Sequence, residues 1–206
     1  MIEVQTFSLG ALGTNCHILY DADGQAVIVD CDGSGREVEA FVQQRQLCVR
    51  LIALTHGHFD HIGAVQTLRE RYACPVCIGE KETALLASPA LNLSEAMAMR
   101  PLSLTADRTV ADGDAFDVGQ MHWQVLHTPG HTAGSVCYVV DRFLVAGDTL
   151  FAGSCGRTDF PTGDPKAMRA SLQRLAALAG DYTVLPGHGS ATTLHWERAH
   201  NSFMQE

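Results

Sequence analysis

Hydrophobic residues fall in short runs along this chain, and most runs have the length of a strand. In the first half the pattern predicts strands over 3–8, 16–21, 26–30, 49–55 and 75–78. In the second half it predicts strands over 115–118, 121–127, 135–140, 143–147 and 182–185. The run 51–54 is apolar throughout, which is typical of a strand buried on both faces. The chain therefore has two groups of expected strands.

Apolar residues at helical spacing follow several of these strands. They predict helices around 38–42, over 62–72 and over 192–200. Asp164 and Pro165 predict the start of another helix, because Asp is a good N-cap and Pro fits the first turn. The stretch 88–101 has no clear period, and its methionines suggest an adaptable covering segment near the substrate. Strands in two groups, each with helices, predict two packed sheets with helices outside.

Composition narrows the class of protein. The chain has 206 residues, 46% hydrophobic and 18% charged, which is typical of a folded globular protein. It shows no repeat or linker, so we expect one domain over 1–206. No apolar run approaches the ~20 residues of a transmembrane helix. The first residues contain an early acid and no basic region before an apolar stretch, so we expect no signal peptide and a cytoplasmic location.

Net charge limits the partners. Fourteen basic residues against 23 acidic ones give a formal charge of −9, which disfavours nucleic acid and anionic membranes. We therefore expect a small-molecule substrate, and an anionic one would need a local cation.

The seven cysteines are scattered, which favours buried thiols over a disulfide framework. Cys74 and Cys77 form one C-x-x-C pair. No second such pair follows, and the spacing does not place this one at a strand-to-helix turn, so we expect no metal or redox role.

The strongest chemical signal is the segment 55–61, Thr-His-Gly-His-Phe-Asp-His, directly after the apolar run 51–54. Imidazole nitrogens and carboxylate oxygens are the ligands that zinc and iron take in proteins. His56 and His58 can point the same way from an extended segment, whereas Asp60 and His61 begin a helix and aim elsewhere. One segment could therefore serve two metals.

Three further segments repeat this arrangement, each with an apolar strand and then Gly before a metal-capable side chain. They end in His131, Asp148 and His188. Gly permits a tight turn and a close backbone approach there, and strand ends are common positions for ligand sites. The other histidines, at 17, 122, 127, 195 and 200, are expected to be hydrogen-bonded or surface residues.

This order of residues resembles the metallo-β-lactamase superfamily over essentially the whole chain. The resemblance implies an α/β fold, an αβ/βα four-layer sandwich of two mixed sheets flanked by helices. The segments 128–132, 147–151 and 186–189 are similar to the glyoxalase II group, in a short branch without its C-terminal helical domain. Carried over by position, the ligands form two sets and a bridge: His56, His58 and His131; Asp60, His61 and His188; and Asp148 between them.

The resemblance implies two divalent metal ions per chain, zinc first, with iron or manganese as alternatives. It further implies a hydrolase that cleaves a thioester such as S-D-lactoylglutathione with a metal-bridging hydroxide, with Asp60 and Asp148 in the catalytic machinery. Two close metals lower the pKa of a shared water and stabilise the oxyanion. No Ser or Cys nucleophile is needed.

Arg157 is the expected substrate-binding residue, since it can bind a carboxylate bidentately. It stands where the glyoxalase II group has Lys. The tyrosines of that group are replaced by Asp159 and Ser190. The identity of the thiol carrier is therefore left open. Other thioesters or lactones are alternative substrates.

Two alternatives compete with this hydrolase. The segment 156–160 is also similar to persulfide dioxygenases, which use one iron and act on glutathione persulfide. The contexts of Asp164 and His188 favour hydrolysis. A non-catalytic binding module would have lost one or more ligands, and all seven are present.

Overall fold

Strands buried on both faces form the centre of the molecule. The computed structural model describes residues 1–205. Successive side chains of β4 (Cys48–Ala53) point to opposite sides, so Leu51 and Ile52 belong to different apolar clusters. The strand β10 (Phe143–Gly147) divides its side chains in the same way. Each of these strands therefore needs an apolar partner on both faces.

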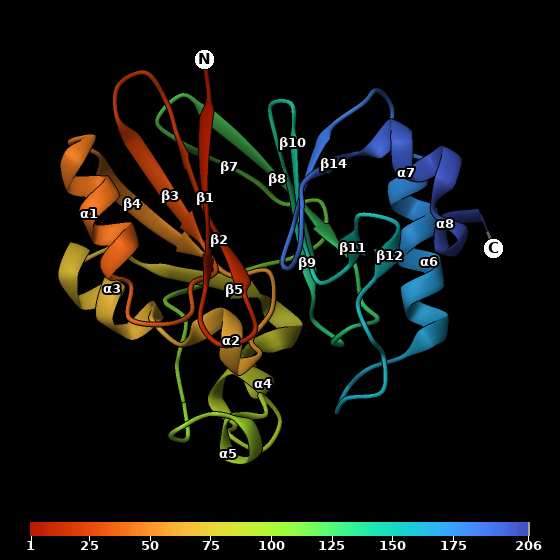
Figure 1. Ribbon diagram of the computed structural model, residues 1–206, viewed down its shortest axis with the longest axis horizontal. Coiled ribbons are helices and arrows are strands. Elements are labelled where there is room, and N and C mark those ends of the chain that lie inside the picture. Colours follow the sequence, from red (N-terminus) through yellow and green to blue (C-terminus); the bar gives the residue numbers. More distant parts are fainter. Residues whose placement is uncertain (206) are drawn as a thin grey trace.

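The strands form two six-stranded mixed sheets that face each other (Figure 1). The first sheet contains, in spatial order, β1 (Glu3–Leu9), β2 (Thr14–Tyr20), β3 (Gln25–Val29), β4, β5 (Val76–Gly79) and β6 (Arg108–Val110). The second contains β14 (Thr192–Thr193), β13 (Thr183–Pro186), β10, β9 (Val136–Val140), β8 (Met121–His127) and β7 (Ala115–Val118). The first is antiparallel up to β3 and parallel beyond it, and the second is parallel only between β10 and β13.

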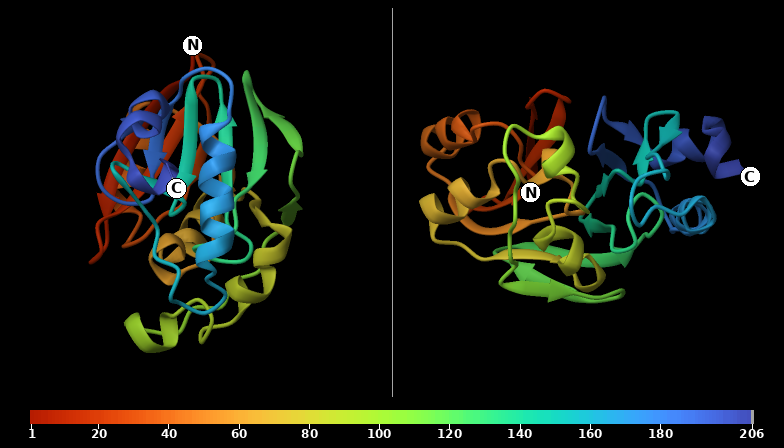
Figure 2. Two further views of the ribbon diagram at one scale, coloured as in Figure 1. Left: turned by 90° about the vertical axis from the view of Figure 1, so that its right-hand side faces the viewer. Right: turned by 90° about the horizontal axis from the view of Figure 1, so that it is seen from below.

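Helices cover the outer faces of both sheets, as the two views of Figure 2 show. On the first sheet lie α1 (Arg36–Gln44) and α3 (Val65–Tyr72), and on the second lies α6 (Pro165–Ala176), followed by α7 (Leu194–His200) and α8 (Ser202–Gln205). Three buried clusters result, one between the sheets and one under each helical layer. The predicted four-layer sandwich is confirmed.

Shorter elements lie at one end of the sandwich, at the bottom of Figure 1 or near its centre. They are α2 (Phe59–Ile62), the 3-10 helix η1 (Glu80–Glu82), α4 (Thr83–Ala87), α5 (Ser94–Met97), and the small hairpin of β11 (Leu150–Phe151) and β12 (Ser154–Cys155). In the described part of the chain, no helix has the length and apolar character needed to cross a bilayer.

The predicted helix over 62–72 is wrong in its continuity, because the structure breaks it between α2 and α3. The break is held by tertiary hydrogen bonds. The Cys31 N–H donates to the carbonyl of His61, and the Ala64 N–H donates to the carbonyl of Cys31. A Cβ at Gly63 would also collide with Asp32. The loop after β3 therefore interrupts the helix.

The terminal helix begins later than predicted. Thr192 and Thr193 pair with β13, and the Thr193 hydroxyl then accepts the Trp196 N–H at 3.2 Å, which caps α7. The start of α6 is confirmed, because the Asp164 carboxylate accepts the N–H groups of Lys166 and Ala167 at 2.8 and 3.1 Å.

Candidate metal centre

Residues from four strand ends meet in one cleft between the two sheets. His56 and His58 lie in the loop after β4, and Asp60 and His61 lie in α2. From the second sheet, His131 follows β8, Asp148 follows β10 and His188 follows β13. The structure thus brings together all seven side chains that the sequence analysis selected.

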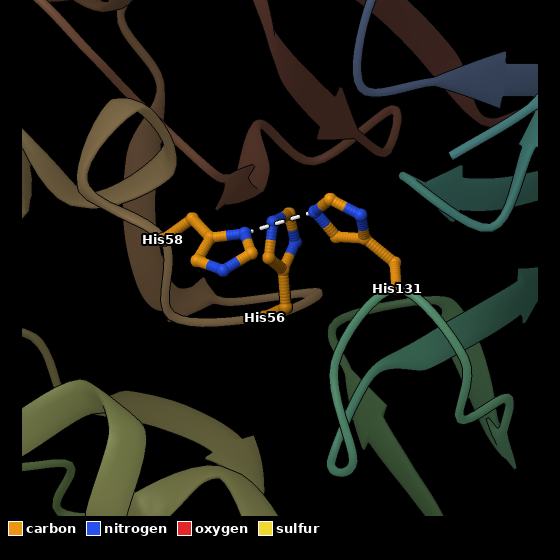
Figure 3. A group of neighbouring side chains, drawn as sticks. All are labelled: His56, His58 and His131. Carbon is orange, nitrogen blue, oxygen red and sulfur yellow. Dashed lines mark hydrogen bonds between the residues drawn. The ribbon is translucent and has the colours of Figure 1, made fainter. Parts of the chain in front are cut away.

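One group consists of three buried imidazoles, His56, His58 and His131, whose ring nitrogens lie within 4.8 Å of one another. Figure 3 shows the three rings turned toward one another, and their centroids lie 4.7 to 4.9 Å apart in pairs. His58 Nδ1 and His131 Nε2 are 2.8 Å apart and share a hydrogen bond. This group joins the β4 loop to the loop after β8.

A second group consists of Asp60, His61 and His188, with ligand atoms within the same 4.8 Å limit. Asp148 lies between the two groups. Its Oδ1 is 3.4 Å from His61 Nε2, and its Oδ2 is 3.5 Å from His131 Nε2 and 3.6 Å from His188 Nε2. The arrangement matches two three-residue sets with one shared carboxylate.

Contacts on the far side of two rings fix their orientation. His61 Nδ1 lies 2.8 Å from a carboxylate oxygen of Asp30, and His131 Nδ1 lies 2.7 Å from the carbonyl oxygen of Arg157. Because those partners are acceptors, Nδ1 carries the hydrogen and donates it. Nε2 of each ring therefore faces the cleft, with a lone pair for a metal when the ring is neutral.

Three buried residues beside the cleft were missed by the sequence analysis. Asp30 directly follows the apolar strand β3, and also accepts the Thr55 N–H and hydroxyl at 2.9 and 2.6 Å. Thr14 donates to Asp60 at 2.8 Å. Glu82 accepts the N–H of Gly57, the residue between His56 and His58, at 3.1 Å. Asp30 repeats the strand-end pattern without a Gly, so that pattern could have revealed it.

Glu82 also connects to the second sheet. Burial raises the Glu82 pKa and outweighs the Gly57 N–H, the Thr132 side chain and the Gly134 N–H, which favour the charged carboxylate. A Cβ at Gly134 would collide with both the main chain and the carboxylate of Glu82. Glu82 therefore lies between the loop of His56 and His58 and the loop of His131.

The electrostatics differ between the two groups. Burial, and then the neighbouring imidazoles, lower the pKa of His56 well below its usual value and that of His58 to about 3. Burial would also lower the pKa of His61, but the carboxylates of Asp60, Asp148 and Asp30 outweigh it and raise that pKa. The second group therefore has a stronger preference for positive charge.

Both cleft carboxylates stay ionised. Burial alone would raise the pKa values of Asp60 and Asp148, but His61 and further polar neighbours outweigh it and hold both below the usual value. Anionic carboxylates together with imidazole nitrogens form a donor set suited to divalent zinc, iron or manganese.

Unpaired buried atoms support a metal at this position. Among the described residues, buried side-chain nitrogens or oxygens without a hydrogen-bond partner include His56 Nε2, His61 Nε2 and Asp148 Oδ1. An unsatisfied buried polar atom is costly, so such atoms call for a ligand. The residues therefore fit a dinuclear metal site.

Glycines allow these side chains to converge, as the sequence analysis predicted. A Cβ at Gly187 would collide with the Asp148 carboxylate and the His61 ring. Gly130, before His131, has φ +146° and packs against the main chain of Met168 in α6. Larger residues at either position would push the loops apart.

Arg157 lines the cleft, but its guanidinium is bound by Asp159 through two contacts of 2.6 Å. The arginine lowers the pKa of the exposed Asp159 to about 2. Its role in substrate binding stays a prediction. Cys74 and Cys77 lie outside the cleft, and burial raises both pKa values to about 11, which keeps them as thiols.

The family model described as the metallo-beta-lactamase superfamily matches residues 9–188. The chain belongs to this superfamily. Its matched region contains all seven cleft residues, so membership supports a metal-dependent hydrolase.

Two relatives extend over nearly the whole chain. The probable metallo-hydrolase YqgX of Bacillus subtilis is 34% identical, with 95% of this chain and 94% of that protein covered. The hydroxyacylglutathione hydrolase GloC of Haemophilus influenzae is 28% identical, with 98% of each chain covered.

Solved structures of the superfamily are also similar. BLEG-1 B3 metallo-beta-lactamase has a TM-score of 0.94 at 37% identity, with 99% of this chain and 100% of that chain covered. TTHA1623 in a di-iron-bound form has a TM-score of 0.86 at 36% identity, with 97% and 100% covered. ETHE1 from Myxococcus xanthus has a TM-score of 0.80 at 29% identity, with 97% and 83% covered.

Proposed function

We propose that this protein hydrolyses thioesters, with S-D-lactoylglutathione as the reference substrate. The observation that carries the proposal is the pair of three-residue groups joined by Asp148. Similarity to GloC, a hydroxyacylglutathione hydrolase, supports the thioester class. The small cleft and the net charge of −9 are consistent with a small-molecule substrate rather than nucleic acid.

The two groups would hold one divalent ion each. His56, His58 and His131 would hold the first, and Asp60, His61 and His188 the second, with Asp148 shared. Zinc suits this mixed imidazole and carboxylate set, and iron is the alternative that TTHA1623 illustrates. Bound there, the ions would supply an activated water and polarise the thioester carbonyl.

The protein's own residues prepare that chemistry in three ways. Asp148 and Asp60 place negative charge beside the ions, while Asp30 and the Arg157 carbonyl hold two imidazoles in the ligating tautomer. The apolar rings of Phe59 and Phe160 line the cleft and limit water around the scissile bond. Arg157, if it leaves Asp159, would bind an anionic part of the substrate.

Metal analysis and one variant test this proposal. Protein loaded with excess zinc should contain close to two equivalents by elemental analysis and should hydrolyse S-D-lactoylglutathione. Asp148→Asn should remain folded by circular dichroism but lose turnover by at least a hundredfold, because an amide does not offset two cations. Saturation at one equivalent, or wild-type turnover by Asp148→Asn with its full metal content, would refute the dinuclear assignment.

Similarity to ETHE1 and the segment 156–160 favour one second candidate, a mono-iron persulfide dioxygenase. That enzyme would contain a single iron and consume oxygen with glutathione persulfide. Oxygen-electrode assays of iron-loaded protein separate the two reactions. The same substrate panel includes a β-lactam, because BLEG-1 is a B3 metallo-beta-lactamase.

A further inference from the structure

Apart from its candidate metal ligands, the cleft is lined mostly by apolar side chains. Its volume is about 440 Å³. One wall comes from the turn between β1 and β2 and from the segment around α5. The apolar lining residues are Leu12, Phe59, Leu93, Met97, Phe151 and Phe160.

Two of these residues are unusually exposed. Leu12 has 51% and Met97 has 50% of its surface accessible, although they come from separate segments of the chain. An isolated exposed Leu or Met is ordinary, but here two line the same cleft as Asp60 and Asp148. A ligand that covers both would remove apolar surface from water, which favours binding.

Within the cleft itself, the charged groups of a thiol carrier have few cations to bind, and Arg100 lines a neighbouring hollow that shares Phe59 and Met97 with the cleft. A peptide or nucleotide thiol carries carboxylates or phosphates, which need cations or N–H donors. Arg157 is the one Lys or Arg among the described residues that line the cleft, and Asp159 already binds it bidentately. Its guanidinium also lies over the Phe160 ring, 3.9 Å from the centroid. The acyl group is the part of a thioester that can be apolar throughout.

We infer that Leu12, Leu93 and Met97 bind an apolar acyl chain, so the preferred substrates are medium-chain acyl thioesters. This inference rests on the proposed function, thioester hydrolysis, and ranks medium-chain acyl groups above the short, polar lactoyl group of the reference substrate. Hydrolysis breaks the acyl carbon–sulfur bond and forms a carbon–oxygen bond with water, giving a carboxylic acid and a thiol without any redox change. The carbonyl lies at the candidate metal centre while the chain extends toward the rim.

A homologous series tests the inference. We expect kcat/KM of the zinc-loaded protein to rise from the acetyl to the octanoyl thioester of one uncharged thiol, N-acetylcysteamine. Full burial of a methylene is worth about fourfold, so partial burial should give roughly twofold per methylene. Met97→Thr and Leu12→Thr should each lower the octanoyl-to-acetyl ratio of kcat/KM by about tenfold.

Met99→Thr is the matched control. Met99 is fully exposed in the same segment and lines the neighbouring hollow but not this cleft, so its variant should keep the wild-type ratio. A wild-type ratio near one, or equal effects of the Met97 and Met99 variants, would overturn the inference and leave thioester hydrolysis standing. A dependence on thiol length at fixed acetyl group would assign the wall to the thiol and overturn it too. Absence of turnover with every thioester would overturn the proposed function itself.

Discussion

Single side chains around the cleft act through the residues they hold in place. Asp30 shows this most directly, because one carboxylate bonds His61 Nδ1 and also the N–H and hydroxyl of Thr55, the residue before His56. It therefore orients a ring of the second group and the start of the loop that bears the first. Glu82 holds the same loop at a later point, since it accepts the N–H of Gly57, the residue between His56 and His58.

We predict that Glu82→Gln weakens binding of the ion at His56, His58 and His131 about tenfold. Binding of the other ion should be largely unchanged. Hydrogen bonds to a charged acceptor are worth about 1.5–3 kcal/mol, and the new amide group would present its own N–H to the donors of Gly57 and Gly134. Chelator competition with zinc measures both affinities. Glu80→Gln, an exposed change in the same 3-10 helix, is the control and should behave as wild type. Equal losses at both ions would show a general effect on folding instead.

Among the elements, α6 is connected to the candidate metal centre through its N-cap residue, which the sequence predicted. Its cap residue Asp164 also donates its own N–H to the Gly130 carbonyl at 2.9 Å, directly before His131. The first turn of α6 and the loop of His131 are therefore fastened at the same residue.

Replacement of Asp164 by Ala should lower the free energy of unfolding by about 1 kcal/mol, the usual cost of losing an N-cap. The main-chain bond to Gly130 survives the change, so kcat should stay within twofold of wild type. Urea unfolding and steady-state assays check these two values. Lys166→Ala keeps the cap and should change neither. A loss above 3 kcal/mol would mean that the Asp164 side chain does more than cap α6.

Elements with a clear period were predictable from the sequence, and the exceptions have physical causes. Continuous apolar runs predicted the strands β4 and β10, and the structure buries the two faces of each strand in different clusters. The strands β6, β11, β12 and β14 have two or three residues each, too few for a period. The break between α2 and α3 depends on hydrogen bonds to Cys31, about 30 residues earlier in the chain, which no local pattern contains.

The residues of the candidate site also divide into those that the sequence could predict and those that depend on distant contacts. His131 and His188 could be predicted because each follows a strand and a Gly, and strand ends meet in space. Glu82 could not, since the sequence Glu-Lys-Glu of 80–82 is typical of an exposed charged turn. Its burial to 1% exposure depends on how η1 packs against the loop of Gly134. Position in the fold, rather than residue type, gives Glu82 its role.

At the scale of the whole molecule, polar side chains of β2 tie the first sheet to the second. Asn15 donates to the carbonyls of Pro186 and Gly189 at 2.9 Å, on both sides of His188. His17 Nε2 lies 3.0 Å from the Pro186 carbonyl, and its Nδ1 lies 2.8 Å from the Thr6 hydroxyl. Because the carbonyl only accepts, His17 is buried in its neutral form with hydrogen on Nε2.

Because of this histidine, the free energy of unfolding should decrease as the pH is lowered. Burial lowers the His17 pKa from 6.5 to about 4, so the unfolded chain binds a proton at a pH where the folded one does not. The contribution is complete above pH 6.5 and is lost as the pH falls toward 4. From pH 7 to pH 5, metal-free wild type should lose about 2 kcal/mol more than His17→Gln in urea unfolding. Parallel losses in the two proteins would show that His17 is protonated in the fold.

The spread of the cleft residues along the chain sets the order of events during synthesis. His58 and His131 are 73 positions apart, and His188 comes later still, beside a bridge to Thr14 near the start. A nascent chain on the ribosome therefore exposes His56, His58 and His61 long before it has made their partners. If the chain takes up the two proposed ions, neither can meet a full set of ligands until the second sheet has been translated and has docked, and the ion that depends on His188 would be the last to be completed. Uptake of the proposed metals would then complete the maturation of this protein rather than begin it.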